Sequence, residues 1–203
     1  VNIPTKFIER EGRRMWLCYA GNFSSGWGGI TFKSRPAGSR YGMCLQEVRL
    51  LAPGESTTPD ALNTPQNIAP EAQVGVSSTY QGYTSGAVND GVVDGFPLNT
   101  SREWASKGEQ DSAFVRLTWS LPETIDRVWL FDRPNNLDQI ISGLLIFSDG
   151  TTLRTGALPD DAKQGLEVSF PPKTVKWLAF FVTGVKQGSP NIGLSEIAVL
   201  RAK

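Results

Sequence analysis

The feature that most constrains the fold is a series of short apolar runs, separated by turn signals, that fills the chain beyond residue 70. In residues 114–120 the apolar side chains Val115, Leu117 and Trp119 alternate with polar ones, a period of two that is typical of a half-buried strand. The same region contains no helix-length apolar periodicity. The pattern therefore predicts an all-β domain.

Further runs of the same kind follow along the chain. An Asp149-Gly150 turn lies between two of them and predicts a hairpin over residues 143–156. The other runs lie at residues 127–131, 166–170, 175–185 and 194–200. A set of about eight strands closes most naturally into a two-sheet sandwich of jelly-roll type.

Residues 53–70 differ in composition from the rest of the chain. They hold four prolines, three threonines and no aromatic residue, which is typical of an extended linker. This linker would separate residues 1–52, whose apolar runs predict a small β-meander, from the domain at residues 71–203. Three strands bury little apolar surface alone, so we expect the first segment to belong to something larger.

Composition excludes several classes of function. Lysine and arginine number 20, as do aspartate and glutamate, so there is no basic field for nucleic acid. No apolar run reaches the roughly 18 residues of a membrane span. Histidine is absent, which excludes histidine-dependent catalysis. The two cysteines, Cys18 and Cys44, have no zinc-binding spacing and are either one disulfide or two free thiols.

Two triplets match the acceptor sequence for N-glycosylation. They are Asn22-Phe23-Ser24 and Asn99-Thr100-Ser101. Because this modification belongs to the secretory route, the triplets favour a secreted, extracellular protein.

Four motifs in the second domain together resemble one known family. They are AVNDGVVDG at residues 87–95, EWAS at 103–106, residues 113–134, and NIGLSEIAVL at 191–200. Residues 71–203 thereby resemble the discoidin, or coagulation factor 5/8 C-type, superfamily of galactose-binding-like domains. The resemblance implies a carbohydrate-binding module whose loops grip the ligand at one end of the sandwich. Residues 1–52 are similar to the last blade of a β-propeller of secreted glycosidase-like proteins, which would make the chain part of a longer enzyme.

A polar loop after a strongly apolar strand is the candidate binding site. Sugars are bound by aromatic faces and by fixed donors such as arginine and asparagine. We expect Arg133 to be the principal contact with the sugar and Asp132 to hold its guanidinium group. Alternatively, the Asp132–Arg133 pair is a salt bridge that only shapes the loop. The remaining candidates lie in this loop or in a neighbouring one: Asn135, Asn136, Asp138, Gln139, Trp104 and Arg102.

A second polar loop raises the possibility of calcium. Calcium takes carboxylate and carbonyl oxygens, and glycine permits the sharp turns that bring them together. Asp90 and Asp94, each followed by glycine, fit that chemistry, and Glu196 matches the C-terminal glutamate that the resemblance assigns to a calcium site. A structural calcium ion is therefore expected here. The alternative is two ordinary Asp-Gly turns and a solvated or capping glutamate.

The favoured function is a noncatalytic carbohydrate-binding module of a secreted protein, monomeric or part of a longer multidomain chain, that binds an oligo- or polysaccharide. The alternatives are a cell-surface or protein-adhesion domain of the same fold, a fragment of a glycoside hydrolase, and a lipid-binding domain. Carboxylate pairs such as Asp160 and Asp161 exist, but neighbouring side chains in extended backbone point apart. No nucleophile-elbow or phosphate-binding motif occurs.

Overall fold

The computed structural model describes residues 8–9, 14–22, 41–50, 61–160, 162 and 164–202. The chain divides into two compact units, Val1–Thr57 and Thr58–Lys203. Each unit is described by itself.

The first unit contains a three-stranded antiparallel sheet. Its strands are β1 (Ile8–Glu9), β2 (Arg14–Asn22) and β3 (Tyr41–Arg49), and they lie in that order in the sheet. The predicted β-meander is thereby confirmed. The register of β2 and β3 pairs Cys18 with Leu45 and Cys44 with Tyr19, so the cysteines do not lie opposite each other. Phe23 and Ser24 of the first glycosylation triplet lie outside the described residues.

The end of the expected linker belongs to the second unit. Ile68 is fully buried, and its N–H donates to the carbonyl oxygen of Val199 at 2.8 Å. Asn67 forms an isolated bridge with Leu200, and its Oδ1 accepts from the N–H of Val199 at 3.1 Å. The proline-rich composition did not reveal that the segment around Asn67 and Ile68 packs on the sandwich, because one buried isoleucine and one bonded amide are enough to hold it there. Residues 53–60 of the expected linker lie outside the described part.

The second unit is one antiparallel sheet of seven strands, in the order β5-β10-β6-β9-β7-β8 with β4 on β6. Its bounds are β4 (Gln73–Val76), β5 (Trp104–Ala105), β6 (Phe114–Asp132), β7 (Ile140–Phe147), β8 (Thr152–Thr155), β9 (Leu166–Val185) and β10 (Gly193–Arg201). The helices of the described part are short 3-10 turns: η3 (Ala69–Glu71), η4 (Ser85–Asn89), η5 (Thr100–Arg102) and η6 (Gln110–Ser112).

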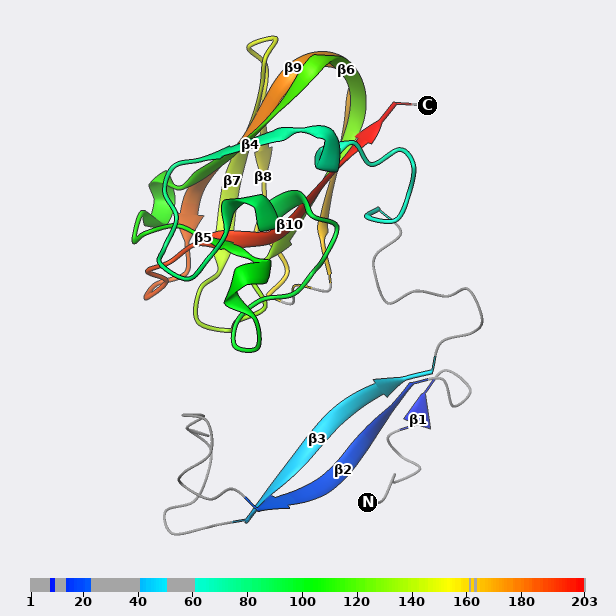
Figure 1. The fold of residues 1–203 in the computed structure, drawn as a ribbon, viewed down its shortest axis with the longest axis vertical. Helices are drawn as coiled ribbons and strands as arrows, with labels where there is room; N and C mark the ends of the chain where they lie inside the picture. Colours follow the sequence, from blue (N-terminus) through cyan, green and yellow to red (C-terminus); the bar gives the residue numbers. More distant parts are fainter. Residues whose placement is uncertain are drawn as a thin grey trace. The chain divides into compact units, whose positions relative to one another are not determined.

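The two longest strands carry the sheet from one layer into the other. The first half of β6 pairs with β4 and with the second half of β9, whereas its second half pairs with β10 and the first half of β9. The ladder shifts register between Thr118 and Glu123, where both strands curve together (Figure 1). The result is a layer of β4, β6, β9, β7 and β8 facing a layer of β5, β10, β6 and β9, which confirms the predicted all-β sandwich.

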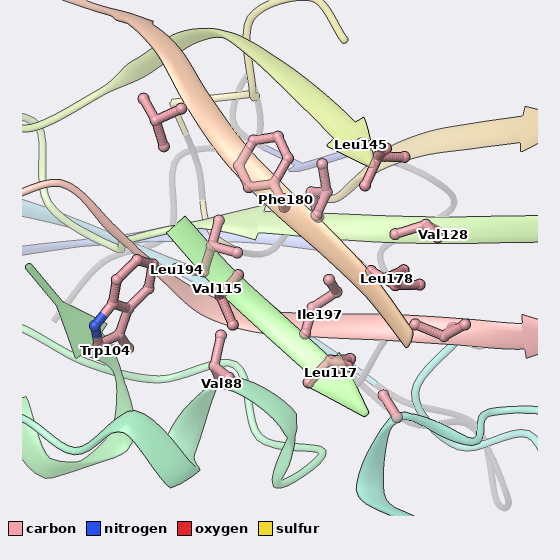
Figure 2. Packing of buried hydrophobic residues seen from close by; sticks show 14 of the residues in the cluster. Val88, Trp104, Val115, Leu117, Val128, Leu145, Leu178, Phe180, Leu194 and Ile197 are labelled. Atoms are coloured by element: carbon pink, nitrogen blue, oxygen red, sulfur yellow. The ribbon is translucent and has the colours of Figure 1, made fainter. Parts of the chain in front are cut away.

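The core lies between these layers, and its residues come from the inward positions of the alternating strands. Val115, Leu117, Leu178 and Phe180 from the first layer meet Ile197 of β10, and all five are buried (Figure 2). The predicted hairpin is also present: β7 pairs with β8, and Gly150 takes the positive φ of +83° that the turn requires. The strands end in loops, and these loops carry the polar side chains described next.

Candidate functional site

Arg133 follows the last residue of β6 and lies at the centre of a buried polar network. Its Nε and one terminal nitrogen donate to the two oxygens of Glu103, at 3.1 and 3.0 Å. Another terminal nitrogen donates to Asp138 at 3.0 Å and to the carbonyl oxygen of Asn191. The fifth N–H donates to the hydroxyl of Tyr83 at 3.0 Å, so every guanidinium donor is bonded within the domain.

The network joins three loops at one end of the sandwich, those between β4 and β5, between β6 and β7, and between β9 and β10. Tyr83 comes from the loop after β4, Glu103 immediately precedes β5, Asp138 precedes β7 and Asn191 precedes β10. The Arg133 side chain is 3% exposed and that of Glu103 is 0% exposed. The expectation that Arg133 is the principal sugar contact therefore does not fit its position: a bound sugar finds no accessible donor on it. The arginine holds the loops together.

Asp132 does not pair with Arg133 as the sequence suggested. Its carboxylate is buried and accepts from the backbone N–H of Arg133 at 2.9 Å and from that of Ile140 at 3.1 Å. Burial raises the pKa of Asp132 to about 7, against the lowering effect of these two hydrogen bonds. Asp132 thus ties the end of β6 to the start of β7.

The amide side chains of the loop differ in their exposure to solvent. Asn135 is buried, and its Oδ1 accepts from the N–H of Leu137 and of Asp138, which makes the turn. Its Nδ2 is buried without a hydrogen-bond partner among the described residues. Gln139 is half-buried, with a 3.4 Å bond from Nε2 to the carbonyl oxygen of Leu158. Asn136 alone among these amides is exposed.

The two candidates from the neighbouring loop have different positions from those expected. Trp104 is fully buried in the core, where its indole N–H donates to the carbonyl oxygen of Ser78 at 2.8 Å. It is therefore not a platform for a sugar ring. Arg102, two residues before Trp104, is exposed on the surface and forms a 3.1 Å ion pair with Asp90.

Exposed apolar side chains surround the arginine network, and the sequence analysis missed them. Phe96 is 39% exposed, and its backbone N–H donates to the Glu103 carboxylate at 2.9 Å. Tyr80 is 43% exposed and packs edge-on against Tyr83. Leu98 and Leu137 are exposed as well. The run Phe96-Pro97-Leu98 between polar residues was the available signal, since a loop rarely needs such side chains for its own folding.

The three expected calcium ligands do not form a cluster of carboxylates. Glu196 is buried, and its oxygens accept from the N–H groups of Gly91, Val92 and Ile197. Burial raises the pKa of Glu196 to about 9, against the effect of these bonds. Asp90 is bonded to Arg102 and to the N–H of Val92.

Asp94 accepts from the N–H of the next residue, Gly95, at 2.8 Å. Within the described part of the chain, no three Asp, Glu, Cys or His side chains come close enough to hold a metal. N–H groups and the Arg102 guanidinium bond the carboxylates of Glu196 and Asp90, so calcium would have to replace some of these bonds to be held here. The glutamate instead fastens the loop to β10, and the expected calcium ion stays a prediction.

The fold has clear structural relatives. The lectin domain of lectinolysin, solved with Lewis b antigen, has 21% identity and a TM-score of 0.55, over 68% of this chain and 99% of that one. A family 32 module of NanJ from C. perfringens, solved with galactose, has 12% identity and a TM-score of 0.54, over 66% and 97%. A module from Clostridium perfringens, solved with GalNAc-β-1,3-galactose, has 12% identity and a TM-score of 0.53, over 66% and 99%.

These likenesses define the class of the second unit as a galactose-binding-like β-sandwich, as the sequence motifs predicted. The chain belongs to the family described as "Domain of unknown function (DUF7402)", whose model matches residues 67–200. No curated protein matches the sequence. Among the described residues no helix has the length and apolar character to cross a membrane.

Proposed function

We propose that the second unit is a noncatalytic carbohydrate-binding module of a secreted protein and that it binds an oligo- or polysaccharide at the loop end of the sandwich. One observation carries the proposal: the Arg133 network, whose guanidinium donors are all bonded, fixes three loops, and exposed aromatic and amide groups lie around it. Rigid loops lose little conformational entropy on binding, so a buried network of this kind favours recognition.

The displayed groups match the chemistry of a sugar. The exposed rings of Phe96 and Tyr80 offer apolar faces to the C–H surface of a pyranose. The exposed amide of Asn136 offers a donor and an acceptor for hydroxyl groups. Each of the three is adjacent in sequence or space to a member of the network, and the described relatives with the same fold were solved with sugars bound.

The chemistry of the network supports binding rather than hydrolysis. Glycoside cleavage needs one carboxyl group that donates a proton and another that acts as base or nucleophile. Glu103 and Asp138 are both held by the Arg133 guanidinium, in ion pairs of 3.0 Å. Such pairing engages both carboxylates with one guanidinium group inside the domain, which leaves neither placed to act on a glycosidic bond.

Secretion is supported by the position of the second glycosylation triplet. Asn99 and Thr100 are partly exposed and Ser101 is exposed, in the loop that enters η5. Asparagine-linked glycans require such an accessible loop. Expression through a eukaryotic secretory route should give a chain whose mass falls after glycan removal, and an Asn99→Gln variant whose mass change is smaller.

A glycan array with the full chain, followed by calorimetry on the best hit, tests the function. Phe96→Ala should weaken binding about tenfold, since an aromatic contact contributes roughly 1 kcal/mol beyond its buried area. Leu121→Ala is the matched control, because Leu121 is 70% exposed in the bend of β6 and should leave binding unchanged. Capture of a protein instead of any glycan would favour adhesion, and release of free sugar would favour an enzyme.

A further inference from the structure

The layer of β4, β6, β9, β7 and β8 has an outer face whose composition is unusual. Alternation places Val115, Leu117, Leu178 and Phe180 in the core and sends their sequence neighbours outward. Within β4, β7, β8, residues 114–118 of β6 and residues 177–185 of β9, none of the outward-facing residues is acidic. The charged groups on this outer face are two arginines, Arg116 and Arg154, and both are exposed.

An apolar row crosses the outer face between the arginines. The register places Phe114 of β6, Phe181 of β9 and Leu144 of β7 side by side. The two phenylalanine rings stack with centroids 6.4 Å apart and planes at 8°, and all three side chains are half-buried. The row therefore offers an apolar surface to the C–H groups of a sugar ring.

The two arginines are free to bind a ligand. Every other arginine whose side chain the structure describes forms an ion pair with a carboxylate: Arg102, Arg127, Arg133 and Arg201. Arg116 lies over the ring of Trp177, with its guanidinium carbon 4.4 Å from the ring centroid, and makes no hydrogen bond or ion pair with a described residue. Arg154 pairs in register with Leu144 and is likewise unpaired.

The cation–π contact with Trp177 restricts the Arg116 guanidinium group, whose N–H groups have no hydrogen-bond acceptor among the described residues. Three strand spacings and a two-residue offset separate the two arginines, a span of about 15 Å. Glu109, in the loop before Phe114, is already engaged by the hydroxyl of Ser77. The outer face is therefore an apolar strip with two arginines that form no ion pair with any residue that the structure describes.

We propose that this outer face binds an acidic polysaccharide, a chain that carries carboxylate or sulfate groups, as a second site distinct from the loop end. The sugar rings would lie along the Phe114–Phe181–Leu144 row, and Arg116 and Arg154 would pair with acidic groups of the chain. Guanidinium groups bind carboxylates through two parallel hydrogen bonds, and the absence of carboxylates on this face removes competing partners. The loop end, by contrast, displays amide and aromatic groups suited to neutral sugars.

Calorimetry of the full chain with polygalacturonate, and with neutral galactan for comparison, tests the inference. Arg116→Gln and Arg154→Gln should each weaken binding of polygalacturonate about tenfold, because each removes one charged pair. Arg127→Gln is the matched control: it lies on β6, removes the same charge and faces away from this site. Binding of polygalacturonate should also weaken as sodium chloride is raised, and neutral galactan should be unaffected by either face variant.

The outcomes separate the two proposed sites. Loss of polygalacturonate binding in the face variants but not in Phe96→Ala supports the second site. Equal binding by wild type, Arg116→Gln and Arg154→Gln overturns it, as does a loss of the same size in Arg127→Gln. Absence of binding to polygalacturonate by the wild type also overturns it and leaves the loop proposal untouched. Self-association that the face variants abolish, or binding to anionic vesicles without binding to the polysaccharide, would assign the face to another partner.

Discussion

At the scale of the residue, the burial of the Arg133 guanidinium group has a large free-energy cost that its partners must offset. A guanidinium group taken out of water costs several kcal/mol, and here two carboxylates, a hydroxyl and a carbonyl oxygen compensate it. The ring of Tyr83 adds a cation–π contact, with the guanidinium carbon 4.9 Å from the ring centroid. The network is therefore stable only when all its members are present.

Replacement of this arginine should be far more costly than replacement of an exposed one. Arg133→Ala leaves the buried carboxylate of Glu103 without its counter-ion, and the free energy of unfolding should fall by about 3–5 kcal/mol. Arg102→Ala is the control, since its pair with Asp90 is 48% exposed on the arginine side and should contribute at most about 1 kcal/mol. Urea denaturation measures both changes. A loss below about 1 kcal/mol in Arg133→Ala would show that the network does not hold the loops.

At the scale of the element, the loops are positioned by the close approach of two strands. Gly193 of β10 pairs with Ala105 of β5, next to Glu103 of the arginine network. A Cβ atom at Gly193 would lie 1.9 Å from the carbonyl oxygen of Trp104, a contact with backbone that cannot move aside. Glycine is required here because the two strands leave no room for a side chain, although the sequence shows it as one glycine among 21.

The methyl group added by replacing Gly193 with alanine should therefore force β5 and β10 apart. Gly193→Ala should lower the free energy of unfolding by about 3 kcal/mol or more, which is the range of overpacking that displaces backbone. Gly75→Ala is the control, since nothing lies within 4 Å of a Cβ atom there, and its change should stay within about 0.5 kcal/mol. Thermal denaturation followed by circular dichroism compares the two. Equal melting temperatures would mean that β5 is not anchored as described.

At the scale of the whole molecule, the second unit has what an independent domain requires. Its main core cluster joins both layers, from Ile68 near the start to Val199 near the end, and a smaller cluster packs Ala61 and Leu62 against Phe131 and Ala198. Burial of the two ends of a domain in one core makes its unfolding cooperative. Residues 61–70 belong to this core, so the boundary lies before them, at about Thr58.

A chain of residues 58–203 should therefore fold alone. Its melting temperature should lie within about 4 °C of the matching transition in the full chain, because residues of this unit form the whole of its core clusters. A chain that begins at residue 71 should melt well below this, since it lacks the buried Ile68 and the hydrogen bonds of Asn67 to Val199. Calorimetry of the two chains decides the boundary. Equal melting temperatures of the two chains would show that residues 58–70 do not stabilise the domain, as expected of the linker that the sequence predicted.

The sequence by itself determined the class of fold, because the alternation in residues 114–120 and the Asp149-Gly150 turn are local patterns that a sandwich and a hairpin need. It also pointed to the loop at residues 132–139 as a binding site, and this loop contains Arg133 and Asp138 of the buried network. What it did not determine is which member of that loop faces water. Arg133 and Asn136 are both polar and lie three residues apart, yet one is buried and the other exposed.

That difference was decided by tertiary structure alone. Arg133 is buried because Glu103, Tyr83 and Asn191 reach it from other loops and Asp138 from its own. Partners that lie up to 58 residues away leave no local pattern in the sequence. The same holds for Trp104, whose buried indole N–H donates to the carbonyl oxygen of Ser78, 26 residues earlier. Hydrophobic alternation is a local pattern within the sequence of one strand. The burial of a charge depends instead on whether residues distant in the sequence come close enough to pair with it.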